Sequence, residues 1–238
     1  MLPMRKIGII GGMTSESTIL YYRILNDLAT QKYGPKHSAK LLINSMDFGV
    51  ISKLQTEGNW NQLNEIIATA ANDLERAGAS CVLIGANTMH LCQPYAQQKV
   101  SVPIIHIATA TAGAIKELGL KKVGLLGTKY TMEKDFYSSV LKENGIETII
   151  PNDADREIVH RVIYEELAFG ELIKASKEQY LEIIQRLKEN GAEGIILGCT
   201  EIPLLIQPAD VAIPLFNTTE IHAKAGFDYA ITRNSMTK

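Results

Sequence analysis

The side chain with the most evident chemistry in this 238-residue chain is Cys199, in the segment ILGCTEIP at residues 196–203. An apolar run typical of a buried strand ends just before it, and Thr200 and Pro203 are residue types that begin helices. Free N–H groups and the dipole at a helix N-terminus lower the pKa of a thiol from about 8.5. We therefore expect Cys199 to act as a base or nucleophile. Glu201 either helps to deprotonate it or only complements the helix dipole.

An earlier segment, LIGANTMH at residues 83–90, resembles this one but carries Ala86 in place of the cysteine. Asn87 and Thr88 follow the alanine, and together with Thr200 they offer amide, hydroxyl and backbone donors that can hold a carboxylate. Their alternative role is helix capping alone. The two segments predict two equivalent halves of one site, of which only the second half contains a reactive thiol.

Two further pairs of segments match in the same order along the chain. RKIGIIGGMT at 5–14 resembles KKVGLLGTKYT at 121–131, and VPIIHIATATA at 102–112 resembles IPLFNTTEIHA at 213–223. Self-similarity at a nearly constant offset is typical of an internal duplication. We therefore expect two homologous lobes of about a hundred residues each; the alternative is that any two parallel α/β lobes resemble one another this much.

Short apolar runs rich in Ile, Val and Leu predict buried parallel strands at 6–10, 41–46, 81–85, 102–107, 122–126, 146–150, 194–198 and 212–216. Helical patterns with apolar spacings of three and four lie between several of them, for example at 16–33, 59–78 and 176–191. This alternation predicts an α/β fold of two pseudo-symmetric, doubly wound parallel-sheet lobes. We place the first lobe at residues 1–115 and the second at 116–217, with a C-terminal helix at about 218–238 packing back on the first.

Parallel sheets bind ligands beyond the carboxyl ends of their strands, so we expect the active site in the cleft between the two lobes. Positions 86 and 199 then face each other across a small ligand. The glycine turns of both lobes let backbone amides approach an anion, with added hydroxyl donors at Thr14, Ser15, Ser17, Thr128 and Thr131. Such a pseudo-twofold site suits chemistry in which a carbon loses a proton on one face and regains it on the other.

Composition and motifs argue against several other classes of protein. With 46% hydrophobic residues, 21% charged residues and a formal net charge of −2, the chain has no basic surface for nucleic acid. No apolar run approaches the roughly 18 residues of a membrane span, and the first residues enter a strand pattern without a signal peptide, so we expect no membrane partner and a cytoplasmic enzyme. The three cysteines lack CxxC spacing, and neither G-x-G-x-x-G nor a P-loop occurs, so we expect no metal and no cofactor.

The segments IGIIGGMTSEST, GANTMH, LLGTKYTMEKDFY, IYEELAFG and GCTEIPLLI resemble, in order, the motifs of the aspartate/glutamate racemase family, which works without pyridoxal phosphate. The resemblance covers nearly the whole chain and is closest to the branch of L-aspartate/glutamate racemases. It implies a two-lobed α/β fold, a homodimer, and an acidic amino acid held between the lobes as the small-molecule substrate.

The resemblance also assigns roles to individual residues. Cys199 matches the second catalytic cysteine, whereas Ala86 lies where the family has a first cysteine, or threonine in the closest branch. Because a methyl group can neither accept nor donate a proton, we expect racemisation to be impaired. The residues that would hold the α-carboxylate and amine are Asn87, Thr88, Thr128, Thr131 and Thr200, while Met13 and Gln55 would line the pocket. Ala168 replaces a lysine that meets the distal carboxylate in many aspartate racemases.

Three functions are consistent with this pattern. The first is cysteine-based racemisation of aspartate or glutamate on a scaffold that is naturally degenerate or deliberately altered at position 86. The second is a decarboxylase or isomerase with one cysteine, which protonates a carbanion from one side; the loops rich in Thr and Asn disfavour it, because its leaving carboxylate needs an apolar pocket. The third is an amino-acid-binding protein without catalysis.

Overall fold

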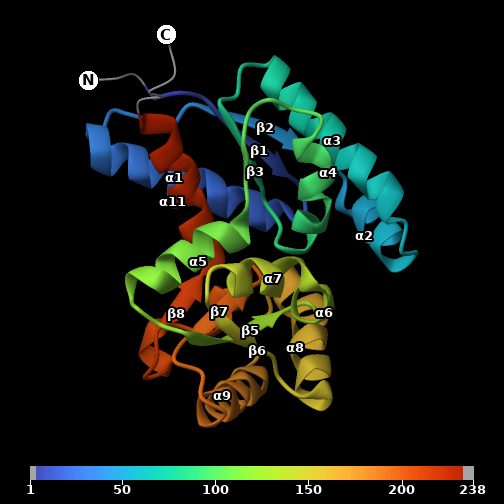
Figure 1. Cartoon of the computed structure of the whole chain (residues 1–238), viewed down its shortest axis with the longest axis vertical. Coiled ribbons are helices and arrows are strands. Elements are labelled where there is room, and N and C mark those ends of the chain that lie inside the picture. The colour runs from blue at the N-terminus through green and yellow to red at the C-terminus, as the bar shows by residue number, and fades with distance from the viewer. Residues whose placement is uncertain (1–3, 233–238) are drawn as a thin grey trace. The chain divides into compact units, whose positions relative to one another are not determined.

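The computed structural model describes residues 4–232, and its contacts divide the chain into two compact units (Figure 1). Of the described residues, 4–106 and 222–232 form unit 1, and 107–221 form unit 2. Each unit, as described, contains one four-stranded sheet in which all neighbouring strands are parallel. The strand order, β2-β1-β3-β4 in unit 1 and β6-β5-β7-β8 in unit 2, is the same when counted along each unit. The predicted α/β fold with two parallel-sheet lobes is confirmed.

The strands of unit 1 are β1 (Ile7–Gly11), β2 (Leu41–Ser45), β3 (Cys81–Ile84) and β4 (Ile104–Ile105). Its helices are α1 (Ser15–Tyr33), α2 (Phe48–Thr56), α3 (Trp60–Arg76), the 3-10 helix η1 (Thr88–Cys92), α4 (Gln93–Gln97) and most of α11 (Thr218–Ile231). The expected runs at 41–46 and 81–85 are found almost unchanged. The run at 102–107 yields only a two-residue strand, because the next helix begins at Ile107.

The strands of unit 2 are β5 (Lys122–Gly127), β6 (Glu147–Ile149), β7 (Ile195–Gly198) and β8 (Leu215–Asn217). Its helices are α5 (Ile107–Glu117), α6 (Lys129–Glu133), α7 (Asp135–Glu143), α8 (Asp153–Glu165), α9 (Lys174–Glu189) and α10 (Ile202–Leu205), with 3-10 turns η2 (Leu167–Phe169) and η3 (Pro208–Asp210). The two halves of the chain thus repeat one strand order with helices of different lengths.

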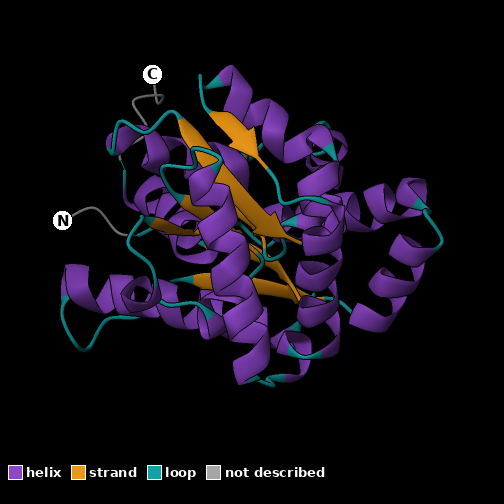
Figure 2. Cartoon of the chain, turned by 90° about the horizontal axis from the view of Figure 1, so that it is seen from below, coloured by secondary structure: helices purple, strands orange, loops and turns teal. Residues whose placement is uncertain are grey.

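Helices cover both faces of each sheet, and Figure 2 shows the strands among them. In unit 1, one core joins the sheet to α2 and α3, and a second core joins its other face to α1 and α11. In unit 2, α8 and α9 share one core with the sheet, and α5 and α7 share the other. Because both faces are buried, the central strands read as continuous apolar runs rather than as alternating ones.

Two segments decide the boundary between the units. Residues 107–115, expected in the first lobe, belong to unit 2 because Ile107 and Ile115 of α5 pack against Val123 of β5. In the other direction, Phe227 of α11 packs in unit 1 against Ile9 of β1. The expectation of a helix to residue 238 falls partly on residues 233–238, which lie outside the described part, as do residues 1–3.

The turn after β1 needs glycine for a local reason. Gly12 has φ +78, and a Cβ there would lie 2.2 Å from the carbonyl oxygen of Met46. The backbone N–H of Gly12 donates to the hydroxyl of Thr18, 2.8 Å away. Thr14 accepts a hydrogen bond from the Ser17 N–H and so caps α1. The glycine pair therefore brings β1 and α1 against the end of β2.

Candidate active site

In unit 1 the carboxyl end of β3 leads directly to Ala86, which is partly buried. Ala86 packs against an apolar cluster that includes Met13, from the turn after β1, and Met89 of η1. Gln55, in the last turn of α2, donates a hydrogen bond from its side-chain amide to the sulfur of Met89, 3.1 Å away. The structure therefore places Gln55 against Met89, and Met89 in the same apolar cluster as Met13 and Ala86.

Asn87 and Thr88 follow Ala86 at the start of η1, and both are almost fully buried. Their backbone is held by His90, whose Nδ1 lies 3.0 Å from the Ala86 carbonyl and 3.3 Å from the Asn87 carbonyl. Since carbonyl oxygens only accept, Nδ1 carries the proton. This bond spans four residues in sequence, so the i, i+4 spacing of Ala86 and His90 was the signal that sequence reasoning missed.

A buried aromatic cluster supports the same loop. The ring of His90 lies 4.9 Å from that of His106 and 5.3 Å from that of His222, measured between centroids. The Tyr21 hydroxyl donates to Nδ1 of His222, and Nε2–H of His222 donates to the Ile105 carbonyl, both at 2.7 Å. Burial lowers the pKa of His106 and of His222 to about 4, so both imidazoles are neutral at neutral pH.

Ser17 was expected as a hydroxyl donor to a bound anion, and the structure corrects this. Its hydroxyl is buried and donates to the Gly85 carbonyl, 2.7 Å away. The hydroxyl therefore fixes the strand end that precedes Ala86. A buried serine that satisfies a backbone carbonyl is the commoner arrangement, and its sequence context did not distinguish the two.

In unit 2 the matching strand end, that of β7, presents Cys199. The thiol is only partly exposed and donates a hydrogen bond to Oε2 of Glu201, with Sγ and Oε2 2.9 Å apart. The Thr200 hydroxyl donates to the same oxygen over 2.6 Å, and the Glu201 side chain is buried. A buried carboxylate thus accepts from both the thiol and the neighbouring hydroxyl, and this pair can pass a proton between sulfur and oxygen.

The expected lowering of the Cys199 pKa is wrong in direction. Burial, and then the negative charge of Glu201 and its hydrogen bond, raise the pKa of Cys199 well above its usual value. Backbone N–H groups of Thr200 and Glu201 act the other way but do not prevail. Helix α10 has only four residues, and its N-cap, Glu201, makes no side-chain capping bond, so the expected cap by Thr200 is also absent. The thiol is therefore protonated until a base removes the proton.

Thr128 and Thr131 lie at the carboxyl end of β5. Thr128 caps α6 by accepting from the Thr131 N–H, and the two hydroxyl oxygens are 3.3 Å apart. Both side chains are buried. Strands β5 and β7 are neighbours, so this pair of hydroxyls and the Cys199 thiol belong to the same edge of the second sheet.

Tyr164, in the last turn of α8, also belongs to this region. Burial raises the pKa of Tyr164 to about 12, and electrostatic interactions with Cys199 and Glu201 add to this increase. The phenol is therefore protonated at neutral pH and is available as a donor. Tyr164 lies in the segment IYEELAFG that carries part of the family resemblance, but the sequence analysis assigned no role to it.

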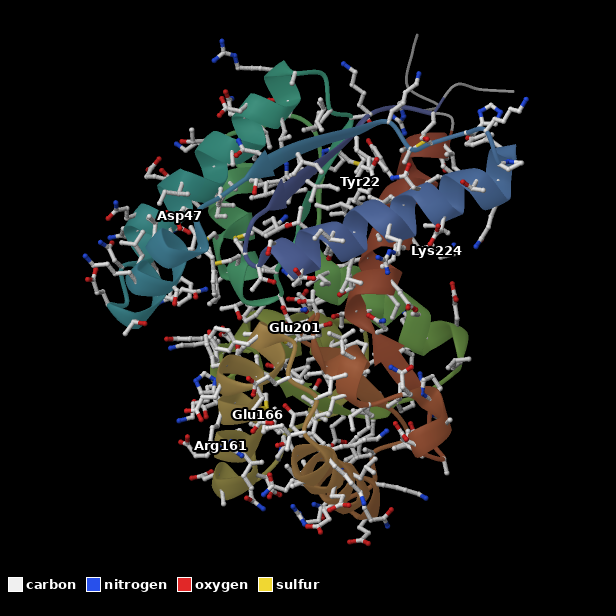
Figure 3. The ribbon with its side chains drawn as sticks, turned by 180° about the vertical axis from the view of Figure 1, so that it is seen from behind. Tyr22, Asp47, Arg161, Glu166, Glu201 and Lys224 are labelled. Carbon is white, nitrogen blue, oxygen red and sulfur yellow. The ribbon has the colours of Figure 1, made fainter. Side chains whose placement is uncertain are left out.

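The segment after α8 has no lysine at position 168, where many aspartate racemases have one that meets the distal carboxylate of the substrate. Ala168 lies in η2 and is partly exposed. The neighbouring Glu166 is buried, and its Oε1 accepts from Arg161, with 2.8 Å between oxygen and nitrogen. A guanidinium two turns before Ala168 is therefore tied to a carboxylate of its own unit, as labelled in Figure 3.

Residues 4–232 include no group of three or more His, Cys, Asp and Glu side chains arranged to hold a metal ion. None of the helices in this part is long and apolar enough to cross a membrane.

Known proteins resemble this chain over most of its length. A family model described as Asp/Glu/Hydantoin racemase matches residues 10–226. The broad specificity amino-acid racemase RacX of Bacillus subtilis (strain 168) is 27% identical over 232 residues, which cover 92% of this chain and 95% of RacX.

Two solved structures are also similar. A candidate Asp/Glu racemase from Yersinia pestis is 45% identical with a TM-score of 0.91, covering 96% of this chain and 100% of that one. An aspartate racemase homologue from Pyrococcus horikoshii OT3 is 41% identical with a TM-score of 0.85, with the same coverage of both chains.

Proposed function

Because the chain belongs to the Asp/Glu/hydantoin racemase family, we propose that it moves the α-proton of an acidic amino acid, aspartate or glutamate, with cysteine chemistry and without pyridoxal phosphate. Cys199 is the acid and base of this reaction. Position 86, its counterpart in unit 1, is chemically silent because it is an alanine. Racemisation by this chain is therefore slow.

One observation carries this proposal. The thiol of Cys199 follows β7 and is hydrogen-bonded to the buried Glu201, whereas the equivalent slot after β3 holds the methyl group of Ala86. Strands β3 and β7 have the same place in their sheets, third in each order. A proton-transfer pair therefore exists at one strand end and has no counterpart at the other.

We propose three steps for this reaction, which begin with the hydrogen bond between Cys199 and Glu201. The Cys199 proton first passes to the Glu201 carboxylate, which leaves a thiolate and a neutral carboxylic acid. The thiolate then takes the α-proton of the substrate, whose electron pair remains as a carbanion delocalised into the carboxylate. With no acid at position 86, the carbanion regains a proton from Cys199 on the same face, and the original stereocentre is restored.

We propose the remaining roles from the positions described above. Asn87, Thr88, Thr128, Thr131 and Thr200 hold the α-carboxylate and amine, and Met13 and Gln55 line the pocket. All of these residues lie at the carboxyl edge of their own sheet or next to it. We further propose a cytoplasmic enzyme that acts as a homodimer on a small-molecule substrate.

The decisive experiment is α-proton exchange in deuterated water with each enantiomer of aspartate and glutamate, followed by NMR. We expect deuterium to enter one enantiomer with retention of configuration, and Cys199→Ser to abolish the exchange. Inversion as fast as in the Ala86→Cys variant would refute the silent role of position 86.

A one-cysteine decarboxylase is the second candidate, because a single thiol that protonates one face is what such a reaction requires. Release of carbon dioxide from a substituted malonate, without exchange of aspartate or glutamate, would favour it. Calorimetric binding of an acidic amino acid with no exchange would instead indicate a binding protein.

A further inference from the structure

Two identical pentapeptides, LKENG, end helices α7 and α9 of unit 2 (Figure 1). The first covers residues 141–145 and the second covers residues 187–191. In each, the asparagine is the C-cap residue, and the glycine after it has a positive φ, +75 at Gly145 and +93 at Gly191. An asparagine before glycine can react with its own main chain, because glycine has no Cβ to shield the next backbone nitrogen. The chain therefore carries the same reactive pair in two places.

The main chain of the two turns is closely matched. Asn144 has φ −89 and ψ 6, and Asn190 has φ −81 and ψ 8. The N–H of each following glycine donates to a helix carbonyl 2.9 Å away, that of Lys142 in the first turn and that of Lys188 in the second. Residue types and backbone geometry are therefore the same for both asparagines. A difference in reactivity between them has to come from the surroundings of their side chains.

Those surroundings differ. Asn144 is partly buried; its Nδ2 donates to the Val140 carbonyl, 2.8 Å away, and its Oδ1 accepts from Nζ of Lys116 in α5, 3.3 Å away. Asn190 is exposed, and its side chain makes no hydrogen bond to another described residue. With Arg186 it borders a polar cavity of about 270 Å³. The carboxamide of Asn190 can therefore rotate, whereas that of Asn144 is held from two sides.

We propose that Asn190 is a site of spontaneous deamidation in the folded protein and that Asn144 is protected from this reaction. The main-chain nitrogen of Gly191 gives up its proton to hydroxide and attacks Cγ of Asn190. The bond from Cγ to the side-chain nitrogen breaks, ammonia leaves, and a succinimide ring remains. Water then opens the ring at either carbonyl and gives aspartate or isoaspartate. The net change consumes one water, releases one ammonia and replaces the amide NH2 by OH.

The hydrogen bonds set the order of the two rates. In both turns the bond from the glycine N–H to the helix must open before the nitrogen can reach Cγ, so this cost is shared. Asn144 must also break its bonds to Val140 and Lys116, and each such bond shifts an equilibrium by a factor of a few.

The modification changes the turn that leads into β7, the strand before Cys199. It places a negative charge at the C-terminal end of α9, where the helix dipole disfavours it. Isoaspartate also adds a methylene to the main chain at this point. This inference does not depend on the reaction proposed above.

Incubation of the full chain at pH 8.5 and 37 °C, followed by peptide mapping with mass spectrometry, tests the proposal. We expect Asn190 to convert at least about fivefold faster than Asn144 in the folded protein. In guanidinium chloride the two rates should agree within about twofold, because the local sequence alone then acts. The proposal is overturned if Asn144 reacts as fast as Asn190 in the folded protein, if Asn190 stays intact there, or if its preference persists in the denatured chain.

Variants assign the reaction to one residue. Asn190→Gln should abolish the acidic form that accumulates on isoelectric focusing, whereas Asn144→Gln should leave it. Lys116→Met keeps the length of the side chain but removes the bond to Oδ1 of Asn144, so Asn144 should convert about threefold faster while Asn190 is unchanged. An acidic form that persists in Asn190→Gln would refute the assignment, and a Lys116→Met variant with no effect on Asn144 would refute the protection.

Discussion

At the scale of single residues, the chemistry that we propose for this protein depends on what occupies two equivalent strand ends. Ala86 and Cys199 follow the third strand of their sheets, after the same Ile/Leu-Gly sequence. The surroundings of Ala86 stay organised, because His90 and Ser17 hold the carbonyls on either side of it. A proton-transfer group introduced at position 86 therefore enters a loop that is already fixed.

Restoring such a group should restore racemisation. We expect Ala86→Cys to raise the inversion rate of aspartate or glutamate by roughly 10²- to 10⁴-fold, the usual worth of a positioned acid or base. Ala86→Thr should also gain activity, whereas Ala86→Val, which has the shape of threonine without its hydroxyl, should not. Chiral chromatography of the products measures the rate. A gain with valine equal to that with threonine would assign the effect to packing.

The Cys199 thiol should respond to its neighbour in a defined direction. The Glu201 carboxylate raises the pKa of Cys199 by its charge and its hydrogen bond. Glu201→Gln removes the charge, so the pKa of the thiol should fall, while exchange should slow by about 10² or more because the proton acceptor is lost. Iodoacetamide alkylation between pH 7 and 11 reports the pKa. Faster exchange in this variant would show that Glu201 only suppresses the thiolate.

At the scale of elements, short turns place these residues at the sheet edge. The glycine turn between β1 and α1 is closed by the backbone of Met46, which follows β2, so three elements meet at one point. Met13 follows this turn directly. The position of a proposed pocket residue is therefore decided by a backbone contact that only glycine permits.

Alanine substitutions at two glycines with similar φ angles distinguish the cost of a left-handed backbone from the cost of a steric clash. Gly12 and Gly58 have φ +78 and +66, but a Cβ at Gly58 meets nothing within 4 Å. We expect Gly58→Ala to lower the free energy of unfolding by about 1 kcal/mol, the cost of a left-handed residue with a side chain. Gly12→Ala should cost at least about 3 kcal/mol more, because backbone atoms must move. Urea denaturation measures both, and equal losses would contradict the crowded turn.

At the scale of the whole molecule, the last helix returns to the first unit and completes its interior. His222 of α11 connects Tyr21 of α1 to the Ile105 carbonyl at the end of β4. His222 is 201 residues from Tyr21 and 117 residues from Ile105 in sequence, and both Tyr21 and His222 are fully buried. The interior of unit 1 therefore contains neutral imidazoles that the fold keeps away from solvent.

Acid should destabilise the protein through these groups. The pKa of His106 and of His222 is lowered to about 4, below the ordinary 6.5, so the unfolded chain binds their protons first as the pH falls. The contribution of the neutral histidines to the free energy of unfolding is fully present above pH 6.5. It should fall by about 3 kcal/mol per histidine as the pH approaches 4. Urea unfolding at pH 7, 5.5 and 4.5 checks this.

Two variants measure the share of that pH dependence that belongs to His222. His222→Gln should remove about half of the slope and leave the half that belongs to His106, whereas Tyr21→Phe, which loses a hydrogen bond but keeps both imidazoles, should lower stability at every pH and retain most of the slope. An unchanged slope in His222→Gln would place the acid sensitivity elsewhere.

Sequence reasoning recovered the strands and the duplicated plan, because hydrophobic runs and turn residues report local structure and burial. It also selected Cys199, Asn87 and Thr128 as strand-end residues, since the end of a strand can be recognised in sequence. It misjudged Ser17 and the pKa of Cys199. In both cases the deciding partner, the Gly85 carbonyl or a buried carboxylate, acts through distance and solvent exclusion, which spacing along the chain does not measure.

The sequence by itself thus determined the parallel α/β units, the family and the asymmetry between Ala86 and Cys199, because each is written in residue types and their order. Only the tertiary structure decided that α5 belongs with the second sheet, that His90, His106 and His222 share one buried cluster, and that the Cys199 thiol is protonated. These depend on packing between distant segments, where burial and the nearest charge outweigh the intrinsic properties of a side chain.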